Sequence, residues 1–144
     1  MKLHQALLAN AAFSGTSAVL IALGYSQLRI EIPLPEVYWL LICVGLALFS
    51  GQLALMALTL IKQSSWTQAG TSLVLKLTPS VVVADVVWVM GSLILSLIFK
   101  DEVSELGFGI VSAVNVCVGS LAWLQHRGFK NNKLHLQKQA QPTY

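Results

Sequence analysis

Residues 80–99 read SVVVADVVWVMGSLILSLIF, and this stretch decides the fold of the chain. Its only charged side chain is that of Asp85. A helix needs about 20 mostly apolar residues to cross the hydrocarbon core of a bilayer. Because backbone N–H and C=O groups in lipid must pair within their own segment, a span of this kind is helical. The stretch therefore predicts a transmembrane helix with one carboxylate inside it.

Three further stretches have the same apolar character, namely residues 5–24, 37–61 and 106–125. The chain of 144 residues is 56% hydrophobic and only 10% charged, whereas an average soluble protein carries about 25% charged residues. A soluble core of this size cannot bury so much apolar surface. The sequence therefore predicts an all-α protein, a four-helix transmembrane bundle that forms a single domain over residues 1–127.

The two ends of the chain outside these spans lead to separate expectations. The apolar run that follows Lys2 is longer than that of a signal peptide, and no small-residue cleavage site follows it, so we expect a retained helix. Residues 128–144 are polar, basic and rich in Gln and Asn. We expect them to form a cytoplasmic tail without a fold of its own.

The charges outside the spans are divided unequally between the two sides of the predicted bundle. One side holds seven of the nine Lys and Arg residues, and the other holds two of them with five of the six acidic residues. Cytoplasmic loops carry the excess of positive charge. Both termini are therefore expected on the cytoplasmic side. The seven cations are Lys2, Lys62, Lys76, Arg127, Lys130, Lys133 and Lys138.

Two connections between the spans are predicted from local composition. Residues 29–35 contain two prolines, which favour an extended segment over a helix. Residues 63–79 contain Trp66 and the apolar residues Leu73, Val74, Leu75 and Leu77. This longer connection either lies in the headgroup region as an amphipathic segment or includes the beginning of the third helix.

Polar side chains inside the spans fall on matching helix faces. Helix spacing places Asp85, Trp88 and Ser92 on one stripe of the third helix. At about 1.5 Å per residue, Asp85 and Asn10 both lie roughly 8 to 10 Å into the membrane, so they can meet if the two helices are neighbours. The predicted intramembrane seam consists of Asp85, Asn10, Trp88, Ser92, Ser14, Ser17, Gln52 and Asn115.

Two interpretations of this seam stay open. In the functional one, Asp85 binds or relays a proton or a cationic headgroup, because an ionisable residue at membrane depth marks a functional site by default. In the structural one, Asp85 is protonated and hydrogen-bonds to another helix, which holds the bundle together. The structural interpretation is preferred, because the seam contains no cation and no second titratable group.

An alignment of the chain with itself suggests two hairpins of the same orientation. Aligning Asn10 with Asp85 also pairs Phe13 with Trp88. Such a parallel repeat occurs in some transporter folds. Chance recurrence is the equally good alternative, because small and apolar residues are common wherever membrane helices pack.

Several classes of function are excluded by what the sequence lacks. It contains no nucleophile and base motif, phosphate loop or dinucleotide fingerprint, so an enzyme is the less favoured interpretation. His4 and His126 fall at the ends of their spans, where they cannot face each other across a haem, and no metal site is predicted. The scattered cations of the tail give no indication of nucleic-acid binding.

Three segments carry a resemblance to a known group of proteins: Asn10-Ala-Ala-Phe-Ser-Gly15, residues 84–92 (ADVVWVMGS) and Leu124-Gln-His-Arg-Gly128. With them the chain resembles small four-helix bacterial inner-membrane proteins, a group similar to DoxX-like proteins. The resemblance implies the fold and a location in the bacterial inner membrane. The quinone-linked role of some DoxX-type proteins maps onto no residue here. Small multidrug transporters differ, because they carry a membrane-embedded Glu in their first helix.

Two functions are therefore carried forward. The first is a non-catalytic accessory or assembly subunit of a larger membrane complex. Small residues on the second and fourth helices, such as Gly51 and Gly119, suit packing within the chain or docking of other membrane subunits or of a second copy. No cofactor is predicted, although lipid or quinone could be contacted between the helices. The alternative is a small proton-coupled transporter that uses Asp85.

Overall fold

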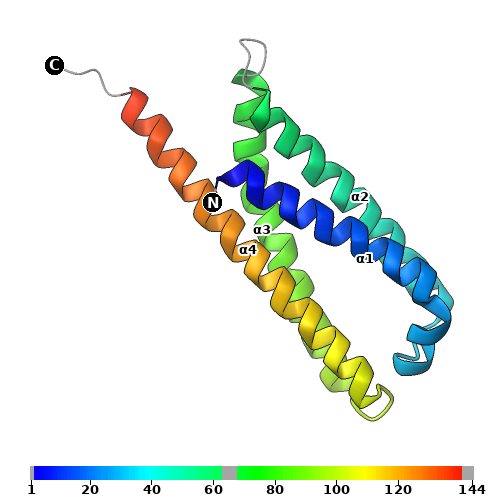
Figure 1. Ribbon diagram of the computed structural model, residues 1–144. Helices are drawn as coiled ribbons and strands as arrows, with labels where there is room; N and C mark the ends of the chain where they lie inside the picture. Colours follow the sequence, from blue (N-terminus) through cyan, green and yellow to red (C-terminus); the bar gives the residue numbers. More distant parts are fainter. Residues whose placement is uncertain (1, 63–67, 141–144) are drawn as a thin grey trace.

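The computed structural model describes residues 2–62 and 68–140, with side chains described over 2–62 and 72–132. Each of its four helices contains a stretch that is long and apolar enough to cross a membrane. The predicted all-α four-helix membrane bundle is confirmed. In chain order the helices are α1 (Leu3–Glu31), α2 (Glu36–Ile61), α3 (Gln68–Ile98) and α4 (Glu105–Ala140) (Figure 1).

The helices form two hairpins. α1 packs along α2, α3 packs along α4, and the hairpins meet chiefly through α1 and α4 (Figure 1). At one end, which we call the basic end, the backbone of Leu3 lies against Gly128. At the other, which we call the acidic end, the Ser104 N–H donates to the Glu31 carbonyl over 3.0 Å. The hairpins are thus joined at both ends of the bundle.

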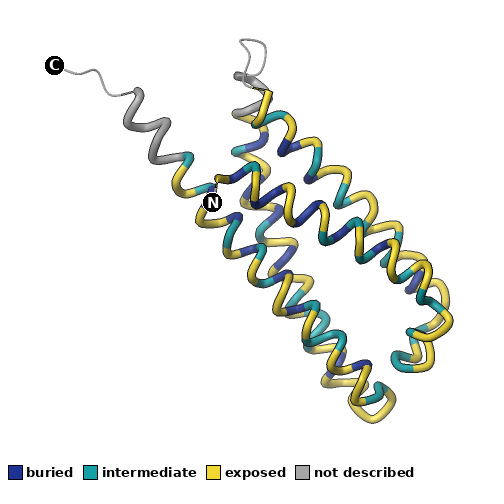
Figure 2. The backbone as a smooth tube through the Cα atoms, in the orientation of Figure 1, coloured by how far each residue is buried: buried dark blue, intermediate teal, exposed yellow. Residues whose placement is uncertain are grey.

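The apolar core lies in the half of the bundle nearest the basic end. Figure 2 shows most of the helix surface exposed, as expected where lipid rather than water surrounds the chain. The buried cluster joins the beginning of α1, the end of α2 and the first half of α3. Its members are Leu3, Leu7, Ala11, Leu53, Met56, Ala57, Val74 and Val81.

The first connection is shorter than predicted. α1 continues through Glu31, and only residues 32–35 separate it from α2. Proline restricts its own backbone and that of the residue before it, so Pro33 and Pro35 exclude helix from residue 32 onward and place no limit on residues 29–31. The prediction of an extended segment was wrong for those three residues.

The second half of the chain is more helical than the spans alone indicate. α3 begins at Gln68 and continues through Pro79, so residues 73–77 belong to the third helix. Residues 63–67, including Trp66, lie outside the described part of the chain. α4 continues past residue 125 to Ala140, so most of the predicted tail prolongs this helix, and residues 141–144 lie outside the described part.

Candidate functional site

The centre of the site is a hydrogen bond between the two hairpins. Asn10 Nδ2 on α1 donates to Asp85 Oδ2 on α3 over 2.9 Å. Both side chains are buried, with 1% of Asn10 and 4% of Asp85 exposed. Ser14, one turn along α1, donates to Asn10 Oδ1 over 3.4 Å. The structure therefore brings together three of the residues that the sequence places in the seam.

A second pair of polar side chains lies further along α3. Ser92 Oγ donates to Asn115 Oδ1 on α4 over 2.7 Å. Ser92 follows Asp85 by seven residues, which is about 10 Å along a helix. The two pairs are therefore separate contacts on one stripe of α3: one fastens α3 to α1, and the other fastens α3 to α4.

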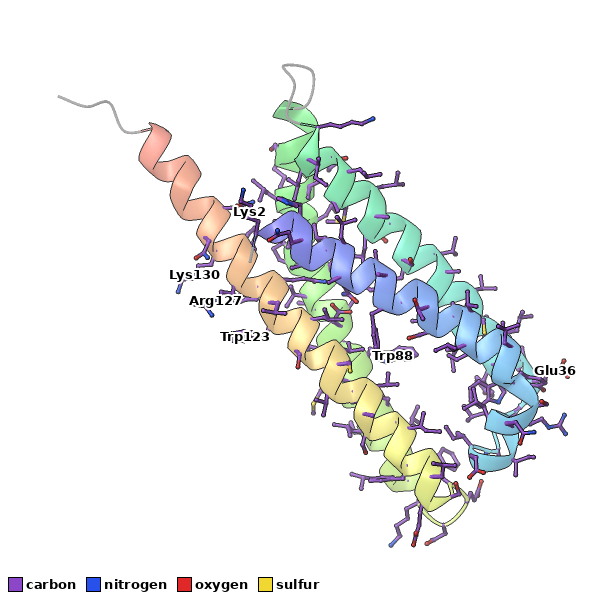
Figure 3. All side chains as sticks on the ribbon, in the orientation of Figure 1. Lys2, Glu36, Trp88, Trp123, Arg127 and Lys130 are labelled. Carbon is purple, nitrogen blue, oxygen red and sulfur yellow. The ribbon has the colours of Figure 1, made fainter. Side chains whose placement is uncertain are left out.

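Three predicted members of the seam do not join these pairs. Gln52 is exposed on the outside of α2, and Ser17 makes no side-chain hydrogen bond with a described residue. Trp88 is 40% exposed, and its side chain projects from α3 into the space between the hairpins (Figure 3). Within the described residues, its indole N–H has no hydrogen-bond acceptor.

Gln125 is a buried polar residue that sequence reasoning missed. It is fully buried, and neither its Nε2 nor its Oε1 has a hydrogen-bond partner among the described residues. The interior row of α4 consists of Asn115, Val118, Ala122 and Gln125, all of them buried. This spacing of three and four residues is the signal that places Gln125 inside the bundle rather than at the boundary of a span.

The acidic end is closed by a compact set of polar contacts. Ser104 Oγ donates to the Glu31 carboxylate and accepts the Gly107 N–H over 2.9 Å, so this serine is the N-cap of α4. A Cβ atom at Gly107 would lie 2.5 Å from the Glu31 carbonyl oxygen. Glycine is therefore required where α4 passes the end of α1.

The chemistry available at the centre of the bundle is hydrogen bonding. In the part of the chain that the structure describes, no basic side chain forms an ion pair with Asp85. The carboxylate is instead engaged by the neutral amide of Asn10. A buried carboxyl group held in this way joins helices, because polar side chains in lipid find their partners on neighbouring helices.

The fold and this interior define a multi-pass membrane protein with four helices and a polar contact between its two hairpins. In comparisons with known proteins, no family model, no curated protein and no solved structure matches the chain. The resemblance to DoxX-like proteins therefore stays a prediction, as does contact with lipid or quinone between the helices.

Proposed function

We propose that the protein is a non-catalytic accessory or assembly subunit of a larger membrane complex. The observation that carries the proposal is the position of Gln52. This side chain is exposed on α2 and makes no hydrogen bond with any described residue. It lies nine residues before Ile61, the end of α2, which is about 13 Å along the helix and therefore at hydrocarbon depth.

A glutamine that faces lipid is unfavourable for a bundle that acts alone. Its amide carries two N–H donors and a carbonyl acceptor, and hydrocarbon satisfies none of them. A helix from another membrane protein, or from a second copy of this chain, supplies backbone or side-chain partners. The exposure of Gln52 thus favours a partner that covers this face of α2.

The neighbouring glycine favours the same interpretation. Gly51 is exposed, and a Cβ atom built on it meets nothing within 4 Å. Small residues let the backbones of membrane helices approach closely. By contrast, Gly15 faces Ser50 on the neighbouring helix within the bundle. Gly51 and Gln52 therefore form a surface of α2 that no described part of this chain occupies.

The environment of Asp85 supports a role without catalysis. Its carboxylate is occupied by Asn10 inside the bundle, and the adjacent residues provide no nucleophile and base pair. The proposed location is the bacterial inner membrane, with the basic end and both termini cytoplasmic. This orientation is supported by the excess of Lys and Arg at that end.

The test is purification of the protein from its native membrane in a mild detergent, with quantification of co-purifying membrane proteins. We expect a stoichiometric partner with the wild type and its loss in both Gln52→Leu and Gly51→Leu. Gly91→Leu on α3 is the matched control, because an added Cβ there also meets nothing within 4 Å. Recovery of wild-type monomer alone, or retention of the partner by both α2 variants, contradicts the proposal.

A small proton-coupled transporter is the second candidate. It is favoured by one observation: the sole carboxylate inside the spans lies where the two hairpins meet, so a change in its protonation acts on the contact between them. Asp85→Asn keeps the shape of the side chain and removes its titration. Loss of a pH-dependent flux with unchanged partner binding supports transport, and retention of every activity rejects it.

A further inference from the structure

A shallow groove lies on α4 between Asn115, at the edge of the interior row, and the exposed side of the helix. Its volume is about 500 Å³. Gly119 opens its centre, because a Cβ atom built there meets nothing within 4 Å. The residues that line the groove all belong to α4: Asn115, Val116, Gly119, Ser120, Trp123 and Leu124.

The groove offers an apolar surface despite two polar residues in its lining. Ser120 Oγ donates to the Val116 carbonyl of its own helix over 2.7 Å. Asn115 turns its Oδ1 toward Ser92 on α3, and its Nδ2 is buried without a hydrogen-bond partner among the described residues. Val116, Leu124 and the 57% exposed Trp123 provide the remaining surface. A hydrocarbon chain therefore suits this groove better than a polar ligand does.

Two cations stand at the end of the groove nearest the basic end. The Arg127 guanidinium carbon lies 5.4 Å from the centre of the Trp123 ring. Lys130 follows one turn later on the same face, and Figure 3 shows Trp123, Arg127 and Lys130 projecting from the same side of α4. A guanidinium stacked on an aromatic ring keeps its N–H edge free for a phosphate.

Among the described residues, no side-chain carboxylate lies beside these two cations. Of the six acidic residues of the chain, five lie at the acidic end and the sixth is Asp85, which is bonded to Asn10 inside the bundle. Neither Arg127 nor Lys130 forms an ion pair with a described residue. Within the described residues, both cations are therefore available to an anionic group of another molecule.

We propose that α4 binds an anionic phospholipid, with its phosphate on Arg127 and Lys130 and one acyl chain in the groove. The dimensions agree with this assignment. From Asn115 to Leu124 the groove extends nine residues, about 13 Å, and one leaflet of hydrocarbon is about 15 Å thick. Trp123 then lies at the headgroup boundary, where tryptophan is enriched in membrane proteins.

A second copy of the chain fits the same groove less well. Two copies inserted in the same direction bring their basic ends together, and like charges at an interface oppose association. An anionic headgroup neutralises both cations instead. This lipid site is independent of the proposed subunit function, because it uses α4, whereas that proposal rests on the exposed face of α2.

The experiment is native mass spectrometry of the full chain in mild detergent, titrated separately with phosphatidylglycerol and phosphatidylcholine. We expect one phosphatidylglycerol to bind in preference to phosphatidylcholine. Arg127→Gln removes a charge-assisted hydrogen bond and weakens phosphatidylglycerol binding about tenfold. Gly119→Leu fills the groove and lowers binding of both lipids.

The matched controls are Lys76→Gln, an exposed cation on α3, and Gly109→Leu, whose added Cβ also meets nothing within 4 Å.

Three results overturn the proposal. Equal affinity of the wild type for the two lipids shows that the cations select no headgroup. If Gly119→Leu binds both lipids as tightly as the wild type does, only the surface charge attracts lipid, and the groove holds no acyl chain. If the wild type is a dimer and Gly119→Leu is a monomer, the groove is instead the binding site of a second copy of the chain.

Discussion

Asn10 on α1 and Asp85 on α3 are hydrogen-bonded to each other over 2.9 Å, across the boundary between the two hairpins. When two repeats are related by a two-fold axis, equivalent residues near the axis face each other across it. The self-alignment that pairs these residues also pairs Phe13 with Trp88. The contact therefore favours the interpretation that the two hairpins are repeats of the same orientation.

Replacing Asn10 with leucine tests what this contact contributes to stability. The substitution leaves the buried Asp85 without its amide donor, and we expect the free energy of unfolding in bicelles to fall by about 1 kcal/mol. Asp85→Asn retains a hydrogen-bonding side chain and is expected to lose less. Ser17→Ala is the control on the same helix. An Asn10→Leu protein as stable as the wild type would show that the contact contributes nothing.

Gly107→Ala is expected to destabilise the acidic end of the bundle. The added methyl group would lie 2.5 Å from the Glu31 carbonyl oxygen, and overpacking of this kind costs about 1–3 kcal/mol. Gly109→Ala adds the same group to the same helix where nothing lies within 4 Å. Thermal unfolding in detergent measures the difference between the variants. Equal melting temperatures would contradict the close approach of α4 to α1.

Ser104→Ala removes the N-cap of α4 together with the hydroxyl that reaches Glu31. Loss of an N-cap costs about 1 kcal/mol. We expect the beginning of α4 to exchange its amide hydrogens faster, Gly107 above all. Thr59→Ala is a suitable control, because that hydroxyl bonds only within its own helix. Unchanged exchange at Gly107 would indicate that water replaces the cap without loss.

Gln125→Leu is expected to stabilise the protein. The amide is fully buried with both polar atoms unpartnered among the described residues, and a buried unsatisfied group costs about 1–3 kcal/mol. Leucine has a similar size and no polar atoms. Denaturation in mixed micelles measures the change in unfolding free energy. A loss of stability would reveal that Gln125 bonds to a buried water or to another partner.

The number and position of the spans could be predicted from the sequence, because hydrocarbon thickness fixes the length of an apolar helix. The pairing of Asn10 with Asp85 could also be anticipated from their equal depths. Depth follows directly from position along a helix that crosses the bilayer. Both predictions rest on distances measured along the membrane normal.

The faces of the helices were harder to predict. For a helix in water, an apolar stripe marks the side that packs inward. For a helix in a membrane, the surrounding lipid and the protein interior are equally apolar. For that reason the sequence placed Gln52 in the seam, whereas it faces outward. Gln125 was treated as the end of a span, although its spacing from Asn115 places it on the interior row of α4.

The contact of Leu3 with Gly128 bears on the order of biosynthesis. Leu3, at the beginning of α1, packs against Gly128, which the ribosome adds 125 residues later. The carboxylate to which Asn10 donates belongs to Asp85, which is synthesised only with α3. While it is being inserted, the first hairpin therefore lies in the bilayer with an unpaired amide and an uncovered end. Its packing is completed only after translation of α4, because Gly128 and the carboxylate of Asp85 are then both present.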